Sequence, residues 1–552
     1  MVGDIKDKAK TQDQTDAAQT GDGATKDARP LQSLSKEDSS AARVAFSNDG
    51  KAASSAASSS LPELSIDIAK GPQGQGQTKD QSRIAPPPDA KSDGANGSAC
   101  KPNQTYLNIV NAAMNTMYDP TAMGKPDEVR HRYDCQITDE RSAQQFAKRA
   151  LESSNDPYNR FLDRKETAEL DRDFAGQSTG YGIDVSKREA DGAVGNNAPL
   201  MLEGVYKGSP AALAGLREGD KILSVDGVNL RKLDFQGAVD AIEGKTGDIK
   251  HPKVERAGKI LDINVKLDEY QRPAIMDKML PGNVGYIRIT DFMQDNTSDD
   301  LKAAILKYGT TKGLVIDLRQ NGGGQLNEGV RAASLFNNKD ELLRIRERQF
   351  SDPEHPTYDD RRLKVIGNNI MSVRSDGSRL LEFSAHKDIV NKPVVLLTDG
   401  GTASAAEIFA GALKGNNDAI TVGEKTFGKG IGQTISRNDS QPGLVLPDGT
   451  AVKVTSFKFF TPNGLWLGDG HDDRRGIEPT IPVKDNRDVV GGKTRDAQIN
   501  TALDYINMVL GEGFQSCWIW RGCRGGAGSR ADACGEAQGS LGAHDLLFFC
   551  FI

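Results

Sequence analysis

The sequence predicts a multidomain protein of the α/β class. Its 552 residues exceed the length that a single hydrophobic core usually serves. Short apolar runs at 313–319, 394–397 and 419–422 have the length of buried strands, and a helical pattern separates the last two runs. Between about 175 and 268, glycine turns and short alternating runs predict a small β-rich domain. The expected order is therefore a helical region, a β-rich domain and a larger core in which helices flank a twisted sheet.

The two ends of the chain have a different composition from the rest. Residues 1–100 are rich in Ala, Ser, Asp, Gln, Lys and Gly, and Phe46 is the only aromatic residue before position 100. Such a segment cannot bury enough apolar surface to fold, so we expect a disordered leader. Residues 511–552 are rich in Gly and Arg, hold four of the six cysteines and end in an apolar run. We expect a disordered or aberrant tail there.

Charge and ligand spacing exclude several classes of protein. The net charge of −7 and the pI of about 5.6 give no basic footprint for nucleic acid. No apolar run reaches the 18 residues of a membrane span, and no signal peptide is visible at Met1. The six histidines are scattered, and the cysteine spacing does not match a zinc site. We therefore expect neither a metal nor a cofactor.

Residues 101–174 show apolar side chains at helical spacing, at 106–117 and again at 146–151. The segment 155–162, N-D-P-Y-N-R-F-L, closes this region and has the composition of an ordinary turn. Cys100 and Cys135 flank the first helical pattern. They form a disulfide in an oxidising compartment or remain two free thiols.

Residues 175–268 contain a glycine turn leading into a strand at 181–185, short helices at 208–216 and 235–242, and a strand with a tight turn at 219–227. The run G-S-P-A-A-L-A-G-L-R-E-G-D-K-I-L-S-V-D-G resembles a protease-associated PDZ domain. The resemblance implies that an open strand edge binds an extended chain end, and that Tyr181, Gly182 and Ile183 bind the peptide, with backbone N–H groups holding its carboxylate. Many relatives carry an arginine after the second helix, where this chain has Glu243. If that arginine couples peptide binding to activity, the coupling is in doubt here.

Residues 393–433 carry the candidate chemistry. Ser404 follows an apolar run and opens a helical pattern, so backbone N–H groups and the helix dipole can stabilise an anion beside its hydroxyl. Lys429, in a glycine-flanked turn 25 residues later, can return as a base, because this stretch contains no histidine. Bringing its pKa from about 10.4 to between 7 and 8 requires roughly 3 to 5 kcal/mol of differential burial. Gln433 or Glu407 can hold the amine in place. Taken singly, Ser404 is equally a helix N-cap and Lys429 a solvated turn lysine.

The segments G-T-A-S-A-A-E and E-K-T-F-G-K-G, with the glutamine that follows them, resemble the C-terminal processing peptidases, a serine and lysine dyad family. The resemblance assigns Ser404 as nucleophile, Lys429 as general base and Gln433 as the residue that orients the lysine. The segment D-L-R-Q-N-G-G-G at 317–324 is similar to the family's oxyanion loop, with Gly322 in place of proline. It implies an oxyanion hole formed by Gly323 or Gly324 and the amide of Ala405.

The same family match implies a crotonase-like or Clp-protease-like core over 273–510 with an inserted PDZ domain. The segment 155–162 is similar to the family's segment ahead of that domain. The charged stretch 337–392 is longer than in most members, and we expect a hairpin beside the active site.

The function implied is a serine endopeptidase that captures apolar protein C-termini in its PDZ domain and cleaves nearby. The sequence leaves open whether the protein has a regulatory partner or forms a homo-oligomer. Two alternatives remain: a peptide-binding adaptor without activity, and an acyl-CoA enzyme on a crotonase-like core. Family members are usually found in the cell envelope or periplasm, which we expect here, with the cytoplasm as the alternative. A further hypothesis places the apolar end of the tail in the chain's own PDZ groove.

Overall fold

The computed structural model describes residues 100–187, 198–336, 341–349, 353–386, 390–440, 443–484, 488–490 and 493–511, which all belong to one compact unit. The expected leader, the tail and its binding to the PDZ groove lie outside these residues. No helix in the described ranges has the length and apolar character needed to cross a membrane.

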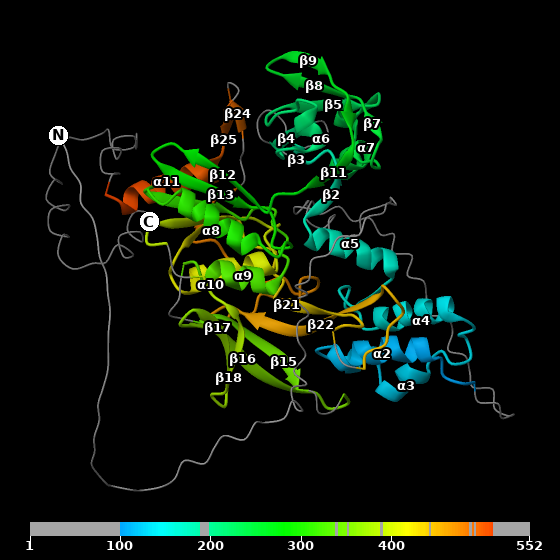
Figure 1. The fold of residues 1–552 in the computed structure, drawn as a ribbon. Helices are drawn as coiled ribbons and strands as arrows, with labels where there is room; N and C mark the ends of the chain where they lie inside the picture. Colours follow the sequence, from blue (N-terminus) through cyan, green and yellow to red (C-terminus); the bar gives the residue numbers. More distant parts are fainter. Residues whose placement is uncertain are drawn as a thin grey trace, which may run out of the picture. The chain divides into compact units, whose positions relative to one another are not determined.

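The first described region is helical, as its apolar spacing predicts (Figure 1). It contains α2 (Gln104–Thr116), a 3₁₀ turn η1 (Pro120–Met123), α3 (Pro126–His131), α4 (Glu140–Glu152) and α5 (Arg164–Phe174). Side chains of Asn103, Asp139 and Asp163 accept the free N–H groups that begin α2, α4 and α5. The buried faces of α2 and α4 pack together and against one face of a long strand described below.

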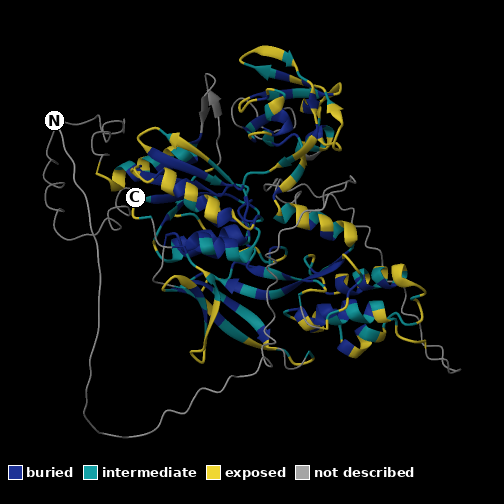
Figure 2. Cartoon of the chain, viewed as in Figure 1, coloured by how far each residue is buried: buried dark blue, intermediate teal, exposed yellow. Residues whose placement is uncertain are grey.

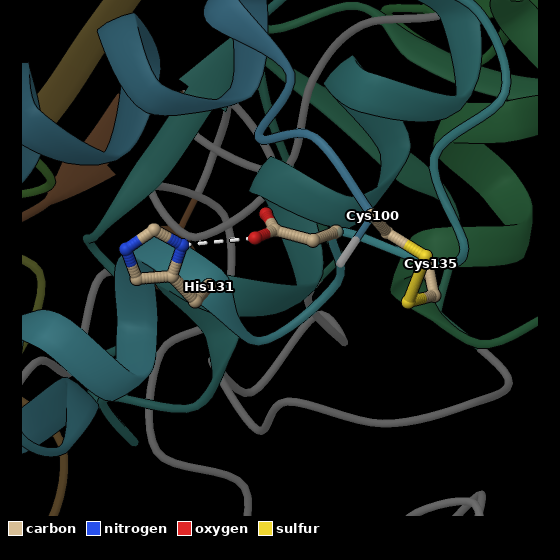
Figure 3. Close-up of a disulfide and its surroundings, with 4 residues drawn as sticks. Cys100, His131 and Cys135 are labelled. Atoms are coloured by element: carbon tan, nitrogen blue, oxygen red, sulfur yellow. Dashed lines mark hydrogen bonds and ion pairs between the residues drawn. A yellow bond between two sulfur atoms is a disulfide. The ribbon is translucent and has the colours of Figure 1, made fainter. Parts of the chain in front are cut away.

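A disulfide closes this helical region. Cys100 and Cys135 are bonded, with Cα atoms 5.2 Å apart, and the bridge lies beside the end of α3 (Figure 3). The His131 ring bonds the carboxylate of Asp134 at 2.8 Å in the same view. Of the two states that the sequence allowed for this cysteine pair, the structure has the bridge.

The β-rich domain expected at 175–268 is a sheet with the strand order β3-β4-β5-β8-β9, and β6 also pairs with β5. Its main elements are β3 (Ile183–Lys187), β4 (Leu200–Val205), α6 (Pro210–Leu213), β5 (Lys221–Val225), β6 (Val228–Asn229), η2 (Leu230–Lys232), α7 (Phe235–Ile242), β8 (Pro252–Arg256) and β9 (Lys259–Asp262). Two strand pairs accompany it: β7 (Ile249–Lys250) with β10 (Val265–Lys266), and β2 (Gln177–Gly180) with β11 (Asp268–Gln271). Strand β3 is therefore an edge strand of the described sheet.

The larger core begins with a six-stranded sheet in the order β12-β13-β14-β19-β20-β23. The strands are β12 (Ile275–Leu280), β13 (Val284–Ile289), β14 (Gly313–Asp317), β19 (Val394–Thr398), β20 (Ile420–Gly423) and β23 (Ile481–Pro482). All neighbours from β13 to β23 are parallel, and β12 is antiparallel to β13. Because both faces of such a sheet are covered, its central strands are almost wholly apolar, which explains the runs seen in the sequence.

Helices cover both faces of this sheet. The side chains of α11 (Ala497–Val509) pack on one face. On the other face lie α8 (Thr297–Lys307), α9 (Leu326–Ala333) and α10 (Ala405–Gly415). Figure 2 shows α10 as the most deeply buried of these helices, because a second sheet packs on its other side. The helix that starts at Ser404 is thus fixed between two sheets.

The second sheet has the order β1-β22-β15-β16-β17-β18, and β21 pairs with β22. It is built from β1 (Arg160–Leu162), β15 (Glu341–Gln349), β16 (Thr357–Ile366), β17 (Asn369–Arg374), β18 (Arg379–Ser384), β21 (Ile431–Ser436) and β22 (Ala451–Phe460). A separate pair, β24 (Asp488–Val490) and β25 (Lys493–Arg495), precedes α11. Strand β22 contributes Val452 and Val454 to the core of the helical region, and Phe457 and Phe459 to the core around α10.

The expectation of a hairpin over 337–392 was wrong. The described residues of this stretch form a meander of four strands, β15 to β18, that extends the second sheet. The high charge is explained by alternation along the strands. Leu343, Ile345 and Leu363 are buried in the core, while Arg346 pairs with Asp360 at 2.7 Å.

Candidate active site

Ser404 lies in the turn between β19 and α10, at the carboxyl edge of the parallel sheet. Its backbone has φ 53° and ψ −116°, a left-handed conformation that costs a residue other than glycine about 1–3 kcal/mol. Neighbouring bonds hold the turn. Thr402 Oγ1 donates to the carbonyl of Leu318 at 2.9 Å, and Asp399 accepts the N–H of Gly401 at 2.9 Å. The serine is thus presented on a strained and well-braced turn.

The glycine loop after β14 lies directly against this turn, because parallel neighbours end at the same edge of the sheet. The N–H of Ala403 donates to the carbonyl of Asn321 at 2.9 Å. Gly323 has φ +97°, and a Cβ atom there would lie 2.7 Å from the carbonyl oxygen of Ala403 and 2.8 Å from the nitrogen of Ala405. Only glycine allows this approach.

The two expected oxyanion glycines differ in what their amides do. The N–H of Gly323 donates to Oδ1 of Asn321 at 2.9 Å. Within the part of the chain that the structure describes, the N–H groups of Gly324 and Ala405 make no hydrogen bond. Gly323 lies against the backbone of Ala405 and Cβ of Ser404, which brings the glycine loop to the serine turn.

Glu407 connects the serine turn to the lysine loop. Its side chain is fully buried, and Oε2 accepts the N–H of Ser404 and the N–H of Lys429, each at 2.9 Å. Oε1 accepts the hydroxyl of Thr426 at 2.5 Å and the N–H of Gly428 at 2.8 Å. Burial raises the pKa of Glu407, and these four donors act in the opposite direction. The sequence suggested that Glu407 holds the amine of Lys429. The four donors given for its carboxylate are instead three backbone N–H groups and the hydroxyl of Thr426.

The Lys429 side chain lies over an aromatic ring. Its Nζ is 3.8 Å from the ring centroid of Tyr158, and a cation in this position is stabilised by about 0.5–2 kcal/mol. The Tyr158 hydroxyl donates to the carbonyl of Gly470 at 3.2 Å, which fixes the ring. Tyr158 belongs to the segment 155–162, whose composition indicated only a turn. The family likeness of that segment was the one signal that could have drawn attention to this tyrosine.

Gln433 lies in β21, opposite Thr455 of β22. Its side-chain amide donates to Oγ1 of Thr455 at 3.1 Å. Asn159 accepts the N–H of Thr455 at 2.7 Å, so the residue after Tyr158 is joined to the same strand. Gln433 and the residue after Tyr158 thus both bind Thr455, and the bond given for the Gln433 amide goes to this threonine rather than to Lys429.

The expected peptide-binding residues lie where the PDZ chain enters its edge strand. Tyr181 is buried in the core of this domain, and its carbonyl accepts the N–H of Ala211 at 2.9 Å. Gly182 has φ +72°, and a Cβ atom there would lie 2.3 Å from Cβ of Ser209. Ile183 begins β3, which pairs with β4 on one side. This leaves the other edge of β3 unpaired within the described sheet.

Comparison with known proteins agrees with this architecture. The profile of peptidase family S41 matches residues 283–483, and that of a PDZ domain matches residues 202–256. The chain is 29% identical over 362 residues to the carboxy-terminal processing protease CtpA of Bacillus subtilis (strain 168), covering 65% of this chain and 67% of the relative. It is 31% identical over 342 residues to CtpB of the same strain, covering 60% and 61%.

Among solved structures, the photosystem II D1 C-terminal processing protease matches with 25% identity and a TM-score of 0.41. That match covers 69% of this chain and 92% of the other.

Proposed function

This chain is a serine-type peptidase of family S41 that carries a PDZ domain, and from that premise we propose that it cleaves proteins near their C-termini with a dyad of Ser404 and Lys429. The observation that carries the proposal is the shared acceptor Glu407, whose Oε2 binds the backbone N–H of both residues at 2.9 Å. A single buried carboxylate therefore sets the distance between the nucleophile turn and the base loop.

In the proposed mechanism, Nζ of neutral Lys429 removes the hydroxyl proton of Ser404 as Oγ attacks the scissile carbonyl carbon. The N–H groups of Gly324 and Ala405 stabilise the oxyanion. We assign Gly324 rather than Gly323 because the Gly323 N–H already donates to Asn321. Lys429 then gives its proton to the leaving amine. Water, deprotonated by the same amine, hydrolyses the acyl-enzyme, and Gln433 orients Lys429.

The PDZ domain supplies the choice of substrate in this proposal. A chain end adds as a further strand to the unpaired edge of β3, and the backbone at Gly182 and Ile183 holds its carboxylate. Apolar terminal side chains suit the apolar residues that line the start of β3, among them Ile183 and Val185. The disulfide between Cys100 and Cys135 supports an oxidising compartment such as the cell envelope, since thiols stay reduced in the cytoplasm.

The test is cleavage of an unfolded protein that ends in apolar residues, compared with the same protein ending in two aspartates. S404A and K429A should each abolish cleavage of both substrates, and the wild type should prefer the apolar tail. K425A is the matched control, because Lys425 lies in the same loop and pairs at the surface with Glu478 at 3.0 Å. Cleavage by S404A would refute the dyad. If the wild type binds the substrate with the apolar tail but does not cleave it, the result would favour the adaptor alternative.

A second arm addresses the acyl-CoA alternative. Hydrolysis of acyl-CoA by the wild type, with no peptide cleavage, would favour that alternative and overturn the proposal.

A further inference from the structure

The Lys429 side chain is bounded by two segments that lie far apart in the sequence. One is the ring of Tyr158, whose centroid is 3.8 Å from Nζ. The other is Gly470, where a Cβ atom would lie 3.0 Å from Cγ of Lys429 and 2.8 Å from the Tyr158 hydroxyl. The aliphatic part of the lysine therefore packs on the glycine, while the amine lies over the ring.

The ring and the lysine are fixed to the same loop. The Tyr158 hydroxyl donates to the carbonyl of Gly470 at 3.2 Å. The N–H of Gly430, the residue after Lys429, donates to the carbonyl of Gly468 at 2.7 Å. Because one short stretch of backbone binds both partners, the contact between ring and amine does not depend on the side chains alone.

The charge on Nζ changes during the proposed reaction. Neutral Lys429 takes the proton of Ser404 as Oγ bonds to the carbonyl carbon, and the electron pair of the carbonyl moves to its oxygen. Nζ is then an ammonium until it gives that proton to the leaving amine. An aromatic face attracts an ammonium much more strongly than a neutral amine. The ring therefore acts on the charge that develops in the transition state.

We propose that Tyr158 is a further catalytic residue, whose ring stabilises the ammonium that forms at Lys429 when Ser404 loses its proton. The carboxylate of a serine, histidine and aspartate triad does the same for its charged base. At low pH the lysine is already an ammonium before the reaction, so there the ring stabilises the starting state and the transition state equally. Its benefit is confined to the pH range in which Lys429 starts neutral. The inference rests on the proposed dyad and adds the group that stabilises its charged base.

Other charged or titratable side chains come from the elements around this pair. They are Glu407 of α10, Lys453 of β22, Asp156 of the segment that carries the ring, and Asp469, His471 and Arg474 of the loop 468–475. Each of these groups is present in every Tyr158 variant. A difference in pH profile between such variants therefore reports the ring.

The test is the pH dependence of kcat/KM for peptide cleavage by Y158L and Y158F. We expect Y158L to lower the plateau at high pH by about 2- to 30-fold and to move the midpoint to lower pH by about 0.4 to 1.5 units, because the ammonium loses its ring. The acid limb should coincide with that of the wild type. Y158F keeps a ring and should stay within about threefold of the wild type at every pH.

Y358L is the matched control. Tyr358 lies in β16, and its ring stacks on that of Tyr118 at 4.5 Å. We expect Y358L to have the plateau and the midpoint of the wild type. The effect of Y158L should also persist in an H471Q background. If it disappears there, the profile belongs to His471 and the inference is overturned.

A second readout follows the nucleophile without a peptide. The rate at which a fluorophosphonate labels Ser404 should show the same lower plateau and midpoint in Y158L, since this attack also leaves a proton on Lys429. An equal loss at every pH, an unchanged Y158L profile, or a loss in Y158F as large as in Y158L would each overturn the inference. Y158M takes the place of Y158L if the leucine variant does not fold by circular dichroism.

Failure of the proposed dyad gives a different result. In that case S404A and K429A would still cleave peptide. If only the inference about Tyr158 fails, both of these variants remain inactive.

Discussion

Replacing Glu407 by glutamine tests whether one carboxylate sets the geometry of the site. The substitution keeps the size of the side chain but turns one oxygen into an NH₂ group. Each oxygen accepts two bonds, so either the pair from Ser404 and Lys429 or the pair from Thr426 and Gly428 faces a donor instead of an acceptor. Two hydrogen bonds to a charged acceptor are lost, and the facing donors stay buried.

The size of the effect follows from those two bonds. Hydrogen bonds to a charged group contribute about 1.5–3 kcal/mol each, so we expect E407Q to lower the free energy of unfolding by roughly 3–6 kcal/mol. Both possible orientations release the loop that carries Lys429 or the turn that carries Ser404. A shift of about 1 Å in a reacting group costs about a hundredfold in rate, so kcat should fall by at least that factor.

The assay combines urea unfolding with peptide cleavage and fluorophosphonate labelling of Ser404. E478Q is the control, because Glu478 is a largely exposed carboxylate whose surface ion pair with Lys425 contributes at most about 1 kcal/mol. We expect E478Q to match the wild type in both measurements. An E407Q enzyme with normal kcat and a normal urea midpoint would refute the view that Glu407 joins the two halves of the site.

Three further predictions follow from the same structure. G323A should lower kcat/KM by roughly a hundredfold because its Cβ meets the serine turn, whereas G377A, with open space around it, should leave kcat/KM unchanged and cost about 1 kcal/mol of stability. C135S removes the disulfide, which closes a loop of sequence separation 35, and should lower the free energy of unfolding by about 4 kcal/mol. A reductant should cause the same loss in the wild type and no further loss in C135S. The pKa of Lys453 falls from 10.5 to about 7 on folding, so the unfolded state binds more protons between these values and stability rises with pH there, by up to about 5 kcal/mol. K453M should flatten that rise in urea unfolding at several pH values.

The parts of the fold that the sequence predicted well are those set by local pattern. The apolar run at 394–397 lies within β19, and the expected helix at 235–242 is α7 with the same bounds. Burial on both faces makes such strands apolar throughout, and helical spacing repeats within a few residues. The turn at Ser404 was also predictable, because an apolar strand pattern stops there and a helical pattern begins. The residue between the two patterns must lie at the edge of the sheet.

The parts that the sequence missed depend on contacts between distant segments. Tyr158 lies just ahead of β1, and its contact with Lys429 depends on how distant strands such as β1 and β22 pair. No local sequence pattern predicts the register between strands that lie so far apart in the sequence. The bonds of Glu407 could not be predicted for a related reason. Its position one turn after Ser404 was visible, but its acceptors were filled by the backbone of a loop more than twenty residues away.

The Tyr158 ring bears directly on the charge that Lys429 carries in the proposed mechanism. The Tyr158 ring favours the ammonium by about 0.5–2 kcal/mol, whereas a working base needs roughly 3–5 kcal/mol in the other direction. Because the ring belongs to the segment 155–162, we expect the helical region to be part of the catalytic unit rather than a spacer. We therefore predict that a chain that begins after β1 keeps Ser404, Lys429 and Glu407 but loses the ring that lies against the Lys429 amine, so its peptide cleavage should have a different pH profile from that of the full chain.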